Sequence, residues 1–344
     1  MTPPSTSDSI NAADIDELDR QVLHCLQIWP RAPWTLVGEV LGIDPMTAAR
    51  RWQSLEESGN AWISVAGLGP NDAVSASIDV RVKPNRIRAL LQVLMGDPSV
   101  HTVRSVLGEW SVMLDWRGDD LIALDNYLNG TLAVLPGVRG TRTHIVTGVP
   151  LDGSTWRLRA LSQDQVAVLR RAAQFEGTPA TAHEVHDIDR ELFTHVSEDG
   201  RATLTSLAKS TNASVATVRR HLEHMLGSKA LVLRCDVARP LSGWPIAAHF
   251  LCTIEPGRLP ETLEALSRIR EVRAAMTLIG PYNLRLNIWL RSLPEITALE
   301  GHLAQKVPHL KVGERSITSR MSKHMHVPLD DLGRRKPVTR PDAA

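Results

Sequence analysis

The sequence predicts an α+β fold in which two winged helix-turn-helix domains alternate with two ferredoxin-like βαββαβ domains. Three observations lead to this prediction. Many residues recur at a spacing of about 170 positions, apolar residues at helical spacing precede a small residue and a turn, and long runs alternate apolar and polar residues as strands do. The recurrence predicts the number of domains, and the two apolar patterns predict their type.

The recurrence extends over most of the chain. A shift of 170 residues superimposes Asp19-Arg20 on Asp189-Arg190. Further on the best shift is 172, and it pairs the alternating run 74–82 with 246–254. Because this register holds over roughly 130 residues with one change of two residues, we interpret the chain as a tandem duplication.

Length and composition are typical of a soluble protein of several domains. The 344 residues are 43% hydrophobic and 22% charged. Since the sequence shows neither a membrane-spanning apolar run nor a signal-peptide core, we expect the cytoplasm. The net charge of +1 excludes a strongly basic nucleic-acid-binding protein but allows a small basic face. Three cysteines without metal or disulfide spacing are expected to be buried hydrophobic residues: Cys25, Cys235 and Cys252.

The two predicted domain types give a complete division of the chain. In chain order we expect a disordered tail at 1–13, a first helix-turn-helix at 14–66, a first βαββαβ domain at 72–147, a linker with a short helix at 148–183, a second helix-turn-helix at 184–238, a second βαββαβ domain at 244–322 and a tail at 323–344. The tail composition indicates disorder from residue 328 onward.

The helix-turn-helix prediction depends on a small residue and a turn in each copy. Gly38 and Ala208 each stand four positions before a residue that tolerates the left-handed conformation, Gly42 and Asn212. A small side chain lets the following helix cross closely, and a short apolar segment after that helix predicts a wing strand. The alternative is a helical interaction module that does not contact DNA.

Charge distinguishes the two copies. Four Lys/Arg stand against eight Asp/Glu between 14 and 65, a net of −4, whereas seven stand against eight between 184 and 236, a net of −1. Because phosphate attraction dominates DNA affinity, we expect the second copy to bind DNA more strongly. The candidate DNA-binding residues are Thr47, Arg50, Arg51, Ser214, Thr217, Arg219, Arg220 and His221. For any one of these arginines, a solvated helix face is the alternative.

Each βαββαβ domain is predicted from strand alternation and two helical runs. The order of elements indicates a ferredoxin-like sandwich in which one sheet face has no helix to cover it. That face requires a partner, which is either the other half of the chain or a second chain.

We expect no cofactor, no metal and no enzyme. The phosphate-loop and nucleophile-turn motifs are missing, and neither His183-Glu184-Val185-His186 nor His324-x-His326 has a third ligand, so exposed histidines are expected. An enzyme on this fold stays an alternative, because ferredoxin-like folds host many activities.

In combination, these motifs resemble the Lrp/AsnC (feast/famine) family. The family pattern L-D-x-x-D-R-x-I-L-x-x-L-Q is similar to residues 15–27, and L-S-x-x-x-V-x-x-R-[VL]-x-x-L-E is similar to residues 43–56. The closing pattern G-V-x-x-T-x-T matches residues 137–143. The resemblance implies a transcriptional regulator that binds double-stranded DNA and whose paired effector (RAM) domains take a small molecule, usually an amino acid. A homo-oligomer formed through the effector-domain sheets is also implied.

The resemblance further implies an effector site at a G-x-x-D turn. The matching turns supply the candidate effector-binding residues Gly108, Glu109, Trp110, Ser111, Gly280, Tyr282 and Asn283. Both turns lack the final aspartate, whose carboxylate would meet a ligand amino group, so the effector differs from an ordinary amino acid or is absent. The alternatives are that both glycines only make tight hairpin turns, and that the protein is a metabolite sensor or assembly module that has lost DNA binding.

Overall fold

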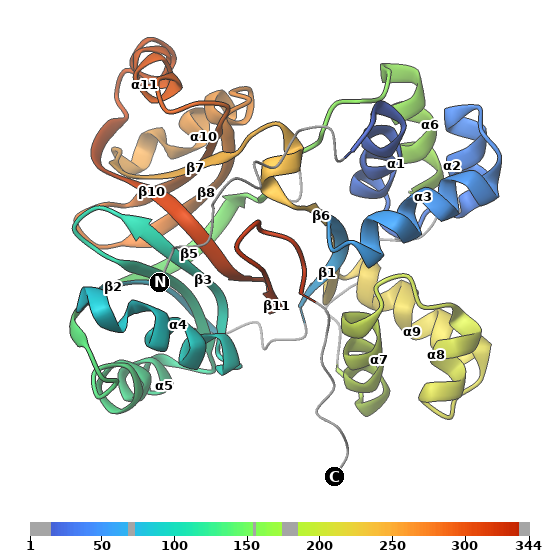
Figure 1. The fold of residues 1–344 in the computed structure, drawn as a ribbon, viewed down its shortest axis with the longest axis horizontal. Coiled ribbons are helices and arrows are strands. Elements are labelled where there is room, and N and C mark those ends of the chain that lie inside the picture. Colours follow the sequence, from blue (N-terminus) through green and yellow to red (C-terminus); the bar gives the residue numbers. More distant parts are fainter. Residues whose placement is uncertain (1–14, 68–72, 154–155, 174–184, 337–344) are drawn as a thin grey trace, which may run out of the picture.

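The structure is a computed structural model that describes residues 15–67, 73–153, 156–173 and 185–336 (Figure 1). The first half contributes, in order, α1 (Glu17–Ile28), α2 (Trp34–Leu41), α3 (Pro45–Glu57), β1 (Ala61–Gly67), β2 (Val74–Val82), α4 (Ile87–Gly96), β3 (Val100–Leu107), β4 (Val112–Gly118), α5 (Leu121–Asn126) and β5 (Val138–Leu151). After α6 (Gln163–Ala173), the second half contributes α7 (Asp187–Glu198), α8 (Leu204–Ser210), α9 (Val215–Gly227), β6 (Leu231–Val237), β7 (Ile246–Thr253), α10 (Leu259–Ser267), β8 (Val272–Ile279), β9 (Leu284–Leu290), α11 (Glu295–Lys306), β10 (Lys311–His324) and β11 (Val327–Pro328).

Three helices and a strand open each half, and we call residues 15–67 and 187–237 the first and second helical units. The turn after α2 depends on Gly42 with φ 67°, and the turn after α8 on Asn212 with φ 49°. A Cβ on Gly38 would lie only 2.7 Å from the carbonyl oxygen of Ile43, so the close approach of the following turn favours glycine there. The predicted reason for the small residue is therefore confirmed.

The two predicted wing strands pair with each other. β1 and β6 form an antiparallel two-stranded sheet in which Ser64 lies opposite Arg234. The hydroxyl of Ser64 donates a 2.5 Å hydrogen bond to a carboxylate oxygen of Asp236, and both residues are buried. The wings therefore join the two helical units into one body, as Figure 1 shows between α3 and α9.

Two arginines fasten the helical units to each other in a reciprocal manner. Arg31 donates to the carbonyl oxygens of Gly200 and Ala202 at 2.8 and 2.7 Å. Arg201, which matches Arg31 at a shift of 170, donates to the carbonyl oxygens of Pro30 and Ala32. Each arginine thus makes the same pair of contacts in the opposite direction, which is the pattern of a two-fold interface.

The remaining strands form a closed sheet in which two long strands cross between the halves. We call residues 74–151 and 246–324 the first and second sheet units. β5 pairs with both β2 and β8, and β10 pairs with both β7 and β3. The order β3-β4-β2-β5-β8-β9-β7-β10 therefore returns to β3 and leaves these strands without a free edge.

Helices cover the outer faces of both sheet units, whereas the inner faces cover each other (Figure 1). Ala76, Ile78 and Val80 of β2 pack under the first pair of helices, as the alternation predicts. Such alternation is typical of a strand that is buried on one face only, but Ser77 and Asp79 on the other face of β2 are buried against the second sheet unit.

The predicted oligomer contact requires a related correction. Because the inner sheet faces meet within the chain, they are not available for a homo-oligomer contact.

The three cysteines are free and buried, as predicted: Cys25, Cys235 and Cys252.

The predicted linker helix is present as α6. Ser162 and Gln165 cap its start reciprocally, and Leu169 is fully buried against the first helical unit. The amide of Gln165 also donates to the carbonyl oxygen of Val40 at 2.8 Å. Among the described residues, no helix, α6 included, has both the length and the apolar character to cross a membrane.

The C-terminal segment differs from the expected disordered tail. β11 pairs with the end of β10, Leu329 is 5% exposed, and Arg335 donates its backbone N–H to the carbonyl oxygen of Gly59. One buried leucine and one short strand leave no periodicity to detect, which is why the sequence indicated a tail from residue 328. Residues 1–14, where the other tail was expected, lie outside the described residues.

Candidate functional site

The two predicted recognition helices, α3 and α9, begin with different caps. The carboxylate of Asp44 accepts a 2.8 Å hydrogen bond from the backbone N–H of Met46. The hydroxyl of Ser214 accepts one from the backbone N–H of Thr217 at 3.0 Å and lies 2.9 Å from the hydroxyl of that residue. Both caps were predicted, and only the first places a negative charge where a phosphate would approach.

Two of the candidate DNA-binding residues instead fasten the recognition helix to the first helix of their own unit. Arg51 forms ion pairs with Asp16 and Asp19, the latter at 3.1 Å. His221, its equivalent at a shift of 170, lies with Nδ1 2.9 Å from the buried carboxylate of Asp189. Since both side chains are engaged inside their units, they position the helix and are poorly placed to contact DNA.

The other candidates on these helices are accessible. Arg50 on α3 and Arg219 and Arg220 on α9 are exposed, while Thr47 and Thr217 are half-buried. Position 49, which matches Arg219, is an alanine, so α3 offers one exposed arginine where α9 offers two. Met46, in the first turn of α3, is 76% exposed.

The two predicted effector turns have the same backbone geometry. Gly108 and Gly280 adopt φ of 150° and 145°, values that favour glycine. In the first turn the N–H of Val106 donates to the carbonyl of Ser111 at 3.0 Å, and in the second Leu278 donates to Asn283 at 3.0 Å. The structure therefore supports the alignment of the two turns and leaves their ligand role a prediction.

A cavity of about 260 Å³ lies beside the first turn, between the two sheet units. Gly108, Glu109 and Trp110 line one wall. The Trp110 ring lies under the guanidinium groups of Arg81 and Arg142, at 4.8 and 4.9 Å. An aromatic face with a nearby cation and a buried, unpartnered indole N–H gives this wall both apolar and polar contact groups.

The second turn does not join this cavity. Asn283 uses its amide within the turn, because its Nδ2 donates to the carbonyl of Ile254 at 2.7 Å and its Oδ1 accepts from the N–H of that residue at 3.0 Å. Tyr282 packs on Gly313, where a Cβ would lie 2.2 Å from the ring. The two turns therefore have different surroundings, and the ligand role of each stays a prediction.

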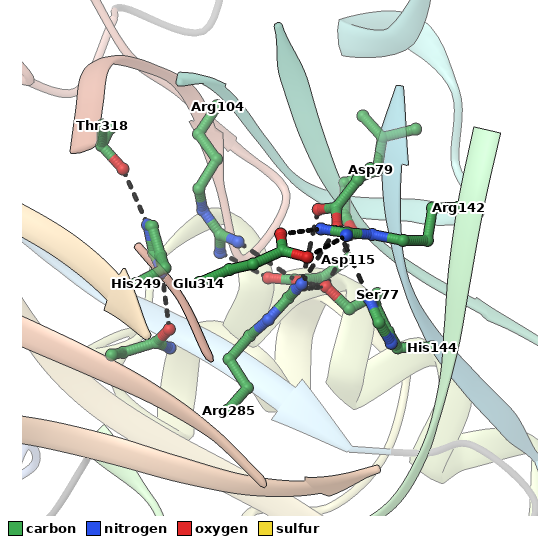
Figure 2. A network of polar contacts seen from close by, with 12 residues as sticks. Ser77, Asp79, Arg104, Asp115, Arg142, His144, His249, Arg285, Glu314 and Thr318 are labelled. Atoms are coloured by element: carbon green, nitrogen blue, oxygen red, sulfur yellow. Dashed lines mark hydrogen bonds and ion pairs between the residues drawn. The ribbon is translucent and has the colours of Figure 1, made fainter. Parts of the chain in front are cut away.

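A buried polar network forms the floor of the cavity and joins the sheet units (Figure 2). At its centre Asp79, 2% exposed at its side chain, contacts Arg142 at 2.9 Å and Arg285 at 3.4 Å. Arg142 also pairs with Glu314 of β10 at 2.7 Å, and Nε2 of His144 lies 3.5 Å from the Asp79 carboxylate. A second pair, Arg104 with Asp115 at 2.5 Å, and a His249–Thr318 contact of 2.8 Å extend the network.

The network fixes the charge states of its members. Burial disfavours the charged form of Asp79, but contacts with His144, Arg285 and Arg142 outweigh it and lower the pKa to about 2. Burial lowers the pKa of His249 to about 3, so this imidazole is neutral at physiological pH.

None of these network residues was a candidate from the sequence. The signal available was an aspartate on the polar face of a strand, at Asp79, which is ordinary for a solvated face.

The predicted exposure of the histidines near the C-terminus is wrong for His324. Its side chain is 23% exposed and lies 3.9 Å from the carboxylate of Asp236, and burial lowers its pKa to about 4. Of the other histidine motif, His183 and Glu184 lie outside the described residues.

Two family models match the first half of the chain. The AsnC-type helix-turn-helix domain matches residues 15–56, which contain α1 to α3. The Lrp/AsnC ligand binding domain matches residues 75–156, which contain the first effector turn and most of the first sheet unit.

Similar proteins include named transcriptional regulators. The leucine-responsive regulatory protein of Salmonella typhimurium is 31% identical over 143 residues, which are 39% of this chain and 85% of that protein. The transcriptional regulator FL11 of Pyrococcus horikoshii is 28% identical, over 38% of this chain and 89% of its own length.

One solved structure covers nearly the whole chain. The siroheme decarboxylase NirDL, crystallised with an iron-uroporphyrin III analogue, aligns with 90% of this chain and 93% of its own at a TM-score of 0.58. At 13% identity this likeness shows a common fold alone.

Proposed function

Because the chain belongs to the Lrp/AsnC family, we propose that it is a sequence-specific DNA-binding transcriptional regulator whose binding is modulated by a small-molecule effector. The exposed Arg219 and Arg220 of α9, on the third helix of a helix-turn-helix, are the observation that carries the proposal. The proposed function is not enzymatic, and it uses no cofactor.

The two halves are proposed to be tandem copies that pair within one chain. The reciprocal contacts of Arg31 and Arg201, which match at a shift of 170, support this interpretation. So does the pairing of β1 with β6, because each wing is the counterpart of the other. One chain then supplies the two DNA-binding units that a symmetric regulator takes from two subunits. Domain limits close to 14–66, 72–147, 184–238 and 244–322 are part of this proposal.

DNA contact is proposed to come mainly from α9. Arg219 and Arg220 carry two positive charges on an exposed helix face, and Ser214 and Thr217 place hydroxyl groups at its start. α3 offers Arg50 and Thr47, with the Asp44 carboxylate at its start. Since each phosphate contact adds to affinity and to its salt dependence, α9 should dominate both.

The effector is proposed to bind in the cavity beside Gly108, Glu109 and Trp110. The neutral Ser111 replaces the carboxylate of the family turn, while Arg81 and Arg142 lie over the Trp110 ring. Arg81 pairs with Glu109, and Arg142 pairs with Asp79 and Glu314, so the charges here are balanced and the aromatic face of Trp110 is the proposed contact for the effector.

A fluorescence-anisotropy titration with a labelled genomic duplex retained by the wild-type chain tests DNA binding. Arg219→Ala with Arg220→Ala should weaken binding at least tenfold and lower the slope of log K against log salt by about one to two. Arg88→Ala with Arg268→Ala removes the same charge from exposed positions on the helices of the sheet units. This control should change neither the affinity nor the salt slope.

The register supplies a matched comparison between the two units. Arg50 and Arg220 are equivalent at a shift of 170, and Arg220→Ala should cost more affinity than Arg50→Ala. An unchanged affinity and salt slope in the α9 double variant would overturn the proposed contact helix.

A further inference from the structure

A second cavity of about 180 Å³ lies between the sheet units, the wings and the C-terminal segment. Its walls come from β1 and β6, from strands of both sheet units and from residues 329–333. It shares only His249 with the cavity beside the first effector turn, so the two are separate sites. Asp331, which is 73% exposed, lines it, so the cavity opens to solvent beside the C-terminal segment.

Arginines outnumber carboxylates around this cavity. Its lining contains five arginines, namely Arg104, Arg234, Arg239, Arg273 and Arg320, and four aspartates, namely Asp115, Asp152, Asp236 and Asp331. Two of the arginines have a close carboxylate of their own, Arg104 with Asp115 at 2.5 Å and Arg320 with Asp331 at 2.9 Å.

The other three arginines, Arg234, Arg239 and Arg273, have more distant carboxylate partners or none. Asp236 lies 3.5 Å from Arg234 and 4.0 Å from Arg273, and Asp152 lies 3.7 Å from Arg234. Arg239 has no ion pair with any described residue. The cavity lining therefore has more guanidinium groups than carboxylates.

The guanidinium groups also keep unused donors. Nη1 of Arg239, Nη1 of Arg273 and Nε of Arg234 are buried without a hydrogen-bond partner among the described residues. Arg273 lies against the rings of Trp156 and Trp289, at 4.8 and 4.5 Å, and these two rings are themselves in edge contact. Burial lowers the pKa of Arg239 to about 10, and burial together with the neighbouring Arg234 lowers that of Arg273 to about 9.

The rest of the lining is apolar. It includes Trp62, Met276, Ile288, Trp289 and Met321. A cavity of about 150 Å³ holds a benzene molecule, so this one suits a body of roughly ten non-hydrogen atoms.

We propose that this cavity is a second ligand site, which binds a compact organic acid with its apolar body against the tryptophan and methionine side chains and its carboxylate on Arg239 and Arg273. The carboxylate of the acid neutralises the excess positive charge and accepts hydrogen bonds from the unused N–H donors. Guanidinium groups suit this task because they present paired N–H donors to a carboxylate.

The position of the site links the sheet units to DNA binding. Trp62 and Arg234 belong to the two paired wings, while Arg273 and Trp289 belong to β8 and β9. A ligand that contacts both bodies binds best to one arrangement of them and so stabilises it. This coupling rests on the proposed function, whereas binding of the acid does not.

Isothermal titration of the full chain without DNA tests the site. The probes are benzoate, phenylacetate and 4-methylpentanoate, each paired with its neutral amide, together with inorganic phosphate. At least one acid should bind with tenfold or greater preference over its amide. Because no DNA is present, failure here leaves the proposed DNA binding untouched.

Variants of the cavity complete the test. Arg239→Gln should weaken binding of the acid at least tenfold. Arg88→Gln, at an exposed position of α4, should leave that affinity unchanged. If Arg239→Gln fails to fold, Ala274→Val, which narrows the cavity without changing charge, should weaken binding severalfold. Equal binding of acids and amides, binding of phosphate alone, or wild-type affinity in the cavity variant would each overturn the assignment.

Discussion

Asp79 is the residue on which the contact between the two sheet units depends most. Its carboxylate is almost inaccessible and faces two arginines and a histidine that come from both sheet units. A buried charge is tolerated only when it is paired and hydrogen-bonded, and removing one partner leaves the others uncompensated. The neighbouring Arg142 retains Glu314 as a second partner, whereas Arg285 pairs with Asp79 and otherwise contacts the hydroxyl of Ser77.

Asp79→Asn should therefore destabilise the protein by about 3 kcal/mol at neutral pH, measured by urea unfolding. Asp331→Asn, at an exposed ion pair with Arg320, serves as the control and should cost less than about 0.5 kcal/mol. Equal effects of the two changes would contradict the role assigned to Asp79.

The lowered pKa of Asp79 predicts how stability depends on pH. Since the pKa is about 2 in the folded chain and about 4 in an unfolded one, the stabilisation is present above pH 4 and is lost as the pH falls towards 2. The fall in unfolding free energy over this range should be shallower in Asp79→Asn by about 2 kcal/mol.

Sequence patterns predicted the surroundings of the candidate residues unevenly. The exposed Arg50, Arg219 and Arg220 were correctly expected on the accessible parts of two helices, because helical periodicity gives the face of a helix. Arg51 and His221 were misjudged because their partners, Asp19 and Asp189, lie 32 positions earlier in the chain. Periodicity within one helix carries no information on such contacts.

At the scale of elements, the paired strands β1 and β6 and the contacts of Arg31 and Arg201 hold the two helical units together. β1 and β6 pair along their whole length, and Arg31 and Arg201 bind carbonyl oxygens of the opposite unit. Each guanidinium group makes charge-assisted hydrogen bonds, which contribute more than neutral ones. Neither arginine was singled out from the sequence, although both match in the 170-residue register.

Arg31→Ala should loosen the contact between the units without unfolding either. Loss of two charge-assisted hydrogen bonds leaves the carbonyl oxygens of Gly200 and Ala202 unsatisfied, and a change of about 1.4 kcal/mol corresponds to tenfold faster opening. Amide hydrogen exchange in residues 199–203 should accelerate about tenfold or more. Arg190→Ala, at a 66% exposed side chain of α7, is the matched control and should leave exchange there unchanged.

The strands were predicted in type and order but not in extent. β5 was expected to end near residue 146 and continues to Leu151, because its last residues pair with β8 of the other half. A sequence pattern reports local alternation, whereas pairing between halves depends on residues more than 100 positions apart. The closed order of strands could therefore not be predicted from the sequence.

For the whole molecule, the two halves are complementary where identical halves would repel. Arg142 and Glu314 match at a shift of 172 and pair with each other across the sheet contact. Arg285 matches Met113, and Asp79 matches Leu251, so the Arg285–Asp79 contact has no charged counterpart at the equivalent positions. Two copies of the first half would set Arg142 against itself, which disfavours pairing of like halves and favours pairing within one chain.

The helical units differ from each other as well, and the proposed regulator is asymmetric as a result. α9 has two exposed arginines and a serine cap, while α3 has one exposed arginine and an aspartate cap. The first unit is also covered by α6. The architecture and this imbalance followed from the sequence, whereas the pairing of the halves required the structure.

Selection of genomic DNA fragments on the full chain, followed by sequencing, tests the proposed function most directly. We predict that the wild-type chain enriches a small set of fragments with a common sequence, and that Arg219→Ala with Arg220→Ala loses this enrichment while Arg88→Ala with Arg268→Ala keeps it. A wild-type chain that enriches no fragment over the input would contradict a DNA-binding regulator and favour a sensor that has lost DNA binding.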